Sequence, residues 1–155
     1  MQALLLVLVS IFCITVHAGH PAKPQPPKQT KKPSSPYQEK FVQYGAENGT
    51  VMEGFLVYPK SVGQRPNSAP AVIVFHAFTG RTEFDNQKAR DLAKLGYVAF
   101  AADVYGKGVA SNDTNENFGI MGQLLAERDT TLQRRGRAAW AAVNNLPFVN
   151  GQKVF

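Results

Sequence analysis

The chain has 155 residues, a net charge of +6 and 44% hydrophobic residues, which is enough for one domain with a hydrophobic core. Its one cysteine, Cys13, lies near the N-terminus. The composition therefore excludes a disulfide framework, a cysteine-rich zinc site and a cysteine nucleophile in the rest of the chain.

Residues 1–18 are predicted to form a secretory signal peptide. Residues 3–16 are a run of 14 mostly apolar residues without a charge, shorter than the roughly 20 residues that a membrane helix needs. Ala18 supplies the small residue before an expected cut at Gly19. The prediction is thus a protein that is secreted or lies in the secretory pathway, with no stable membrane insertion after the signal is removed. An uncleaved anchor and a buried N-terminal element are the alternatives.

Residues 19–36 are predicted to be an extended, disordered linker. They contain six of the ten prolines, four of the 17 basic residues and no acidic residue, so residues 37–155 carry a net charge of only +2. This composition favours a solvated spacer, and binding of a polyanion or an acidic membrane is the alternative. No aromatic residue lies among the lysines and no nucleic-acid-binding motif follows, so we expect no nucleic acid partner.

The folded domain is expected over residues 37–155 and begins with a predicted β-hairpin. Its strands are residues 41–44 and 51–58, and Asn48-Gly49 between them suits a tight turn. Asn48-Gly49-Thr50 and Asn112-Asp113-Thr114 are also N-glycosylation sequons, which agree with a secreted protein.

A β-α-β unit follows the hairpin. Residues 71–75 are an apolar run without alternation, typical of a strand that is buried on both faces of a parallel sheet. Thr82 is a predicted helix N-cap with Asp85 as its capping-box acid, and Gly96 ends the helix. The apolar face of this helix is expected to comprise Phe84, Ala89, Leu92, Ala93 and Leu95. Residues 97–102 are the next buried strand.

A long helix is expected over residues 120–144, after an irregular segment, and a last strand over residues 152–155. Gly136 inside the helix predicts a close approach of the helix to the sheet, because glycine costs about 1 kcal/mol relative to alanine there. A basic cluster on this helix is expected to be a solvated face that pairs with Glu127 and Asp129. The predicted apolar stripe comprises Leu125, Leu132, Gly136, Ala139, Trp140 and Val143, and the basic cluster comprises Arg128, Arg134, Arg135 and Arg137.

This order of elements predicts an α/β fold whose ligands bind outside the carboxyl ends of the parallel strands. His76 directly follows the first of these strands, and either orders its loop through backbone hydrogen bonds or acts as a base. No G-x-S-x-G motif provides a nucleophile for it, and no G-x-G-x-x-G precedes Asp103 to favour a dinucleotide site. The N–H of Phe78 is a candidate oxyanion-hole donor, with a plain strand-to-helix connection as the alternative.

Three sequence stretches occur together and in order: HAFTG at 76–80, ARDLAKLGYVA at 89–99 and DVYG at 103–106. They resemble the dienelactone hydrolase (carboxymethylenebutenolidase-like) family, and the similarity extends over residues 39–155. The resemblance implies an α/β-hydrolase-type three-layer fold. It also implies hydrolysis of a carboxylic ester or lactone by a Cys or Ser nucleophile with an Asp and a His, without a metal or an organic cofactor. It places His76, Ala77 and Tyr105 at the substrate-binding cleft and Phe78 at the oxyanion hole.

The chain departs from the family pattern in two respects. Members with lactone chemistry usually have Glu after the motif histidine, where this chain has Ala77. The family's nucleophile elbow, Asp and His follow the strand that is expected at residues 152–155, so we expect a fold truncated before the elbow. The leading hypothesis is the N-terminal fragment of a secreted ester or lactone hydrolase that is inactive alone and that acts, at full length, on a small-molecule ester or lactone. The alternative is a short, secreted, non-catalytic binding module built on half the fold.

Overall fold

A five-stranded mixed sheet organises the described part of the chain, which in this computed structural model is residues 34–47 and 49–155. The predicted signal peptide with its cleavage site at Ala18 and Gly19, the linker up to residue 33, and the sequon residue Asn48 lie outside the described residues. The strand order is β1-β2-β4-β3-β5. The strands are β1 (Tyr37–Glu47), β2 (Thr50–Pro59), β3 (Ala69–Phe75), β4 (Val98–Ala102) and β5 (Val149–Val154).

The predicted hairpin is confirmed. Strands β1 and β2 are antiparallel, Glu47 pairs with Thr50, and Gly49 between them has a φ of +81°, a conformation that suits glycine. A bulge interrupts the pairing at Gly45, whose φ is +52°. A Cβ on Gly45 would lie 2.9 Å from the Cβ of Ala138, so the bulge lets β1 approach the helix that covers it.

The helix α1 (Glu83–Lys94) begins as the sequence predicts. The carboxylate of Asp85 accepts hydrogen bonds from the Thr82 N–H at 2.7 Å and from the Thr82 hydroxyl at 2.9 Å. Gly96 follows the helix with a φ of +96°. The predicted apolar face is only partly right: Ala89 and Ala93 are buried, but Phe84 is 69% exposed and Leu95 is 74% exposed.

The predicted long helix is in fact two helices joined by a π-helical turn. These are α2 (Thr114–Ala126), the turn η1 (Arg128–Leu132) and α3 (Gln133–Asn144). Helix α2 begins earlier than predicted because the Asp113 side chain accepts hydrogen bonds from the N–H groups of Asn115 and Glu116. At the turn, the Leu132 N–H donates to the Glu127 carbonyl five residues back, and the Thr131 hydroxyl donates to the Glu127 carboxylate at 2.6 Å.

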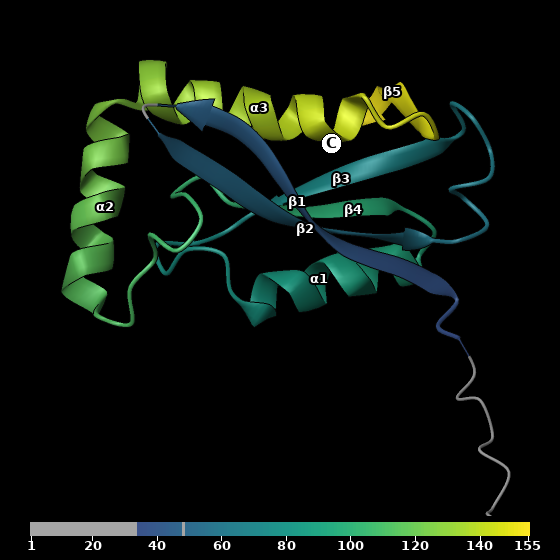
Figure 1. The fold of residues 1–155 in the computed structure, drawn as a ribbon, viewed down its shortest axis with the longest axis horizontal. Coiled ribbons are helices and arrows are strands. Elements are labelled where there is room, and N and C mark those ends of the chain that lie inside the picture. The colour runs from purple at the N-terminus through teal and green to yellow at the C-terminus, as the bar shows by residue number, and fades with distance from the viewer. Residues whose placement is uncertain (1–33, 48) are drawn as a thin grey trace, which may run out of the picture. The chain divides into compact units, whose positions relative to one another are not determined.

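Helices cover both faces of the sheet, with α1 on one face and α3 on the other (Figure 1). The α1 side packs on β2 and β4 through the buried residues Phe55, Val57, Ala89, Ala93, Ala99 and Ala101. The larger core, on the α3 side, contains Met52, Leu56, Val98, Phe100, Ala139 and Val143 among others. A small third cluster, Val104, Tyr105 and Leu124, joins α2 to the sheet. This three-layer arrangement is of the α/β-hydrolase type, as the sequence predicts.

Two predictions about burial are wrong in part. Strand β3 is not buried along its whole length: Ala71 is inaccessible, but Phe75, its last residue, is 51% exposed and lines an open apolar groove. No close approach explains Gly136, since a Cβ there would meet no atom within 4 Å outside its own helix. Gly136 instead borders an open apolar groove beside Trp140, which is 46% exposed.

Candidate functional site

The candidate site lies where two loops meet at the carboxyl ends of β3 and β4. These strands are parallel neighbours in which Phe75 pairs with Ala102, so His76 and Asp103 follow them side by side. Parallel pairing thus brings together two residues that are 27 positions apart in the sequence. This is the edge of the sheet at which α/β proteins bind their ligands.

His76 joins the two loops through both of its ring nitrogens. The Val104 N–H donates to Nε2 at 3.1 Å, so Nε2 carries no proton, and Nδ1 then donates to the Ala77 carbonyl at 2.7 Å. The side chain is 1% exposed and its ring packs edge-on against Tyr105, with 4.7 Å between the ring centroids. Of the two roles that the sequence leaves open, this geometry supports the ordering of the loops.

Asp103 shapes the second loop with its carboxylate. Its Oδ1 accepts hydrogen bonds from the N–H groups of Tyr105 at 2.9 Å and Gly106 at 3.1 Å. Burial alone would raise the pKa of Asp103, but the hydrogen bonds from these two N–H groups outweigh burial and hold the pKa below its usual value. The His76 Nε2 lies 3.7 Å from Oδ1, too far for a hydrogen bond, so the two N–H donors provide the closer stabilisation.

Two further residues hold this loop, and the sequence pattern did not indicate either of them. The Tyr44 hydroxyl donates to the Asp103 carbonyl at 2.5 Å and accepts from the Asp103 N–H at 2.9 Å. Arg135 donates to the carbonyls of Val104 and Tyr105, each at 2.8 Å. The prediction that Arg135 belongs to a solvated basic face is therefore wrong, whereas Arg128 is exposed and lies 3.6 Å from Asp129.

Phe78 lies in the first loop, where a hydrogen bond holds its backbone carbonyl but not its N–H. Its carbonyl accepts a hydrogen bond from the Tyr105 hydroxyl at 2.8 Å, and its ring stacks on Phe118 of α2 with 4.6 Å between centroids. Among the described residues, the Phe78 N–H donates to no acceptor. Because a backbone N–H is a strong donor, this group is available to bind a ligand oxygen.

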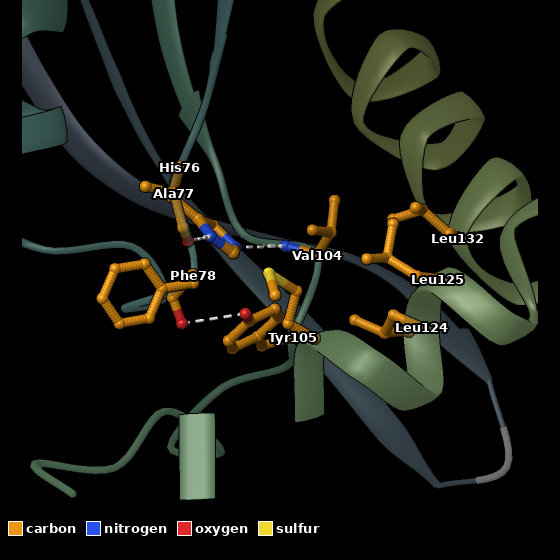
Figure 2. A pocket seen from close by; sticks show the side chains of 9 residues that line it. His76, Ala77, Phe78, Val104, Tyr105, Leu124, Leu125 and Leu132 are labelled. Atoms are coloured by element: carbon orange, nitrogen blue, oxygen red, sulfur yellow. Dashed lines mark hydrogen bonds between the residues drawn. The ribbon is translucent and has the colours of Figure 1, made fainter. Parts of the chain in front are cut away.

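An apolar cavity of about 230 Å³ borders this loop, between the carboxyl ends of the strands and helix α2 (Figure 2). The sequence placed His76, Ala77 and Tyr105 at a substrate-binding cleft, and all three line this cavity. Leu125 and Leu132, assigned by sequence to a core stripe, line it as well, and Leu125 is 52% exposed. The complete lining is His76, Ala77, Phe78, Val104, Tyr105, Met121, Leu124, Leu125 and Leu132.

This arrangement can bind an apolar group and offer one hydrogen-bond donor beside it. Both nitrogens of His76 are engaged, so the ring does not act as a base in this geometry. No group of three or more His, Cys, Asp or Glu side chains within residues 34–47 and 49–155 is placed to hold a metal ion. Over the same ranges, no helix is long and apolar enough to cross a bilayer. Asn112 of the second sequon is exposed directly before the N-cap of α2.

Comparisons with known proteins agree with the fold. Residues 52–155 match the sequence profile of the dienelactone hydrolase family. A comparison with curated proteins finds no match.

Two solved structures of dienelactone hydrolase type are each 27% identical to the chain. They are m3DLH, with a TM-score of 0.68, and the dienelactone hydrolase-like promiscuous phosphotriesterase P91 from metagenomic libraries, with a TM-score of 0.67. In each comparison 77% of this chain aligns and spans 48% of the other, about half its length. An acetyl xylan esterase from Paenibacillus sp. R4, 18% identical over 81% of this chain and 42% of its own, shares the fold with a TM-score of 0.52. Because the family profile covers most of the folded residues, this chain belongs to the dienelactone hydrolase family.

Proposed function

We propose that this chain forms the N-terminal half of the active site of a carboxylic-ester or lactone hydrolase. The observation that supports this most directly is the unbonded N–H of Phe78 beside an apolar cavity, in a member of a hydrolase family. In ester hydrolysis, negative charge develops on the carbonyl oxygen, and a fixed backbone donor at that point stabilises the transition state. Phe78 is in the loop from which α/β-hydrolases take one such donor.

The other loop residues keep this donor in place. Tyr105 fixes the Phe78 carbonyl, and His76 and Arg135 fix the loop that carries Tyr105. We assign them positioning roles. The nucleophile and its acid–base partners belong, in this proposal, to polypeptide that follows β5 in the complete fold. The 155-residue chain alone is then inactive.

The test compares the 155-residue chain with the product of the same coding sequence continued past codon 155, using p-nitrophenyl hexanoate as substrate. The proposal expects a glycine-flanked Ser or Cys soon after β5, turnover by the longer product and none by the shorter chain. Ester turnover by the purified 155-residue chain would contradict the proposed division of the site.

Two variants of the longer product test the role of Phe78. Phe78→Pro removes the N–H donor and should lower kcat about 10²–10³-fold, whereas Phe78→Ala keeps the donor and loses only the ring. Equal activity of the two variants would show that the Phe78 N–H is not an oxyanion-hole donor. A circular dichroism spectrum of each variant controls for folding.

The second candidate function is a non-catalytic binding module. It is favoured by the cavity itself, because the described residues provide an apolar binding volume and no glycine-flanked nucleophile. This candidate predicts that the 155-residue chain is monomeric, unfolds cooperatively, binds an apolar ligand, and has no coding sequence downstream of it.

We also propose that the protein enters the secretory pathway. The apolar segment before Gly19 and the exposed sequon at Asn112 support this proposal. Expression in a eukaryotic secretory host should give a product that migrates faster after peptide-N-glycosidase treatment, and Asn112→Gln should reduce the shift. A product that stays inside the cells at full precursor mass would contradict it.

A further inference from the structure

We infer that the cavity beside Phe78 accepts a neutral, apolar acyl group of medium size and rejects one that carries a carboxylate. The inference rests on the proposed function, because it names the substrate class of that same site. It depends on which polar atoms line the cavity, on where the nearby cations are held, and on the volume of the cavity.

The lining offers no side-chain donor to an anion. Seven of the nine lining residues have hydrocarbon or thioether side chains, and only His76 and Tyr105 carry polar atoms. The His76 Nδ1–H is bonded to the Ala77 carbonyl and the Tyr105 hydroxyl is bonded to the Phe78 carbonyl. With the Phe78 N–H taken by the ester carbonyl, a carboxylate in this cavity would therefore lose its hydration without gaining a side-chain partner, which is strongly unfavourable.

Two arginines that contact or follow the loops of the site are held elsewhere. Arg135 directs its guanidinium to the carbonyls of Val104 and Tyr105. Arg81, at the end of the first loop, donates from Nε to the Glu53 carbonyl at 3.0 Å and from a terminal nitrogen to Asn86 at 2.8 Å. Neither arginine is among the residues that line the cavity. The cavity wall thus lacks the cation that a carboxylated substrate would need.

The volume of the cavity suits an acyl group of medium size. An apolar cavity of about 150 Å³ holds benzene, which has six carbon atoms. The 230 Å³ cavity beside Phe78 is about half as large again, so it fits about nine non-hydrogen atoms on the same scale. A hexanoyl chain fits this volume. The Phe78 N–H at the border of the cavity would then face the carbonyl end of the acyl group.

The experiment compares two esters that share a six-carbon acyl chain and differ in charge. Ethyl hexanoate and monoethyl adipate, an anion at pH 7, are titrated into the ¹⁵N-labelled 155-residue chain, and the amide shifts of Phe78, Val104 and Tyr105 give a Kd for each. The inference expects these amides to shift with ethyl hexanoate and a Kd for monoethyl adipate at least about tenfold higher. Equal or tighter binding of the adipate, or shifts confined to other parts of the chain, would overturn it.

A matched pair of variants tests whether the lining causes the preference. Leu125→Arg places a cation at the cavity, at a residue that is 52% exposed, and should cut the preference for the neutral ester about tenfold or reverse it. Leu95→Arg makes the same change at a residue beyond the end of α1 that is 74% exposed, and should leave both Kd values unchanged. If Leu125→Arg does not fold, Leu125→Trp fills the cavity instead and should abolish ethyl hexanoate binding. An unchanged preference in the folded Leu125 variant would contradict the inference.

Failure of this inference can be told apart from failure of the proposed function. If ethyl hexanoate binds as expected but no continued product hydrolyses it, the proposed function fails and the binding inference stands. If the continued product hydrolyses the adipate ester faster than the hexanoate ester, the proposed function is supported and the inference fails.

Discussion

Replacement of Tyr44 by phenylalanine isolates the contribution of one buried hydroxyl to the candidate site. The hydroxyl bonds both the N–H and the carbonyl of Asp103, which lie beyond the last residue of β4 that pairs with β2. The ring itself packs edge-on against Phe100 with 5.3 Å between centroids, and this contact survives the substitution. Tyr44→Phe therefore leaves a buried donor and a buried acceptor without a partner and keeps the packing.

The expected cost is about 2–6 kcal/mol, because each of the two orphaned backbone groups costs about 1–3 kcal/mol. Urea unfolding of the 155-residue chain, followed by circular dichroism, gives this cost as a lower midpoint at an unchanged slope. Amide exchange at Asp103 should also accelerate.

The matched control is Tyr58→Phe. The Tyr58 hydroxyl donates to no described residue, and the Tyr58 ring packs on Phe148 with 4.6 Å between centroids. We expect this variant to lie within about 0.5 kcal/mol of the parent chain. If Tyr44→Phe is as stable as the control, the hydroxyl does not hold the end of β4 and the reasoning fails.

Four further substitutions test the packing and the electrostatics of the fold. Gly54→Ala should destabilise the fold by about 1–3 kcal/mol in the same urea assay, since its Cβ would lie 2.1 Å from the Phe100 ring. Gly119→Ala should instead stabilise the fold by up to about 1 kcal/mol, because the position lies in α2 with open space around it. Asp103→Asn should reduce the amount of folding stability that is lost when the pH is lowered. The pKa of this carboxyl is lowered in the folded chain, so its contribution to the folding stability is present above the ordinary pKa of 3.8 and is lost as the pH falls below it. An acid transition that is the same in Asp103→Asn and the parent chain would contradict this assignment. Arg135→Met should cost about 2–3 kcal/mol through two lost charge-assisted bonds, and a cost below 0.5 kcal/mol would show that the loop does not need them.

The sequence predicted the elements whose causes are local. The Asn48-Gly49 turn, the Thr82–Asp85 capping box and the stop at Gly96 each depend on residues within a few positions, and the elements built on them form as predicted. Local signals also explain the position of the first loop at the strand end.

What the sequence did not predict depends on contacts between distant residues. The bond between Tyr44 and Asp103 spans 59 positions and that between Arg135 and Val104 spans 31, and neither leaves a periodic pattern. The break between α2 and α3 was missed for a different reason. The heptad-like spacing continues across the break, and the hydrogen bond from Thr131 to Glu127 at the turn leaves no periodic pattern in the sequence. Trp140 was assigned to the core because periodicity cannot tell which stripe of a helix is covered.

Helix α2 is joined to the sheet through a cluster with only three buried members, Val104, Tyr105 and Leu124, and it ends in the π-helical turn. We expect it to be a separate unit of local unfolding, with amides that exchange at a lower free energy than those of β4. The same helix forms one wall of the cavity and stacks Phe118 on Phe78. A ligand that fills the cavity would then slow amide exchange along α2, because it binds only when the helix is folded against the sheet. The free energy of local unfolding of α2 and the affinity of the site would therefore both report the same folding equilibrium of this helix.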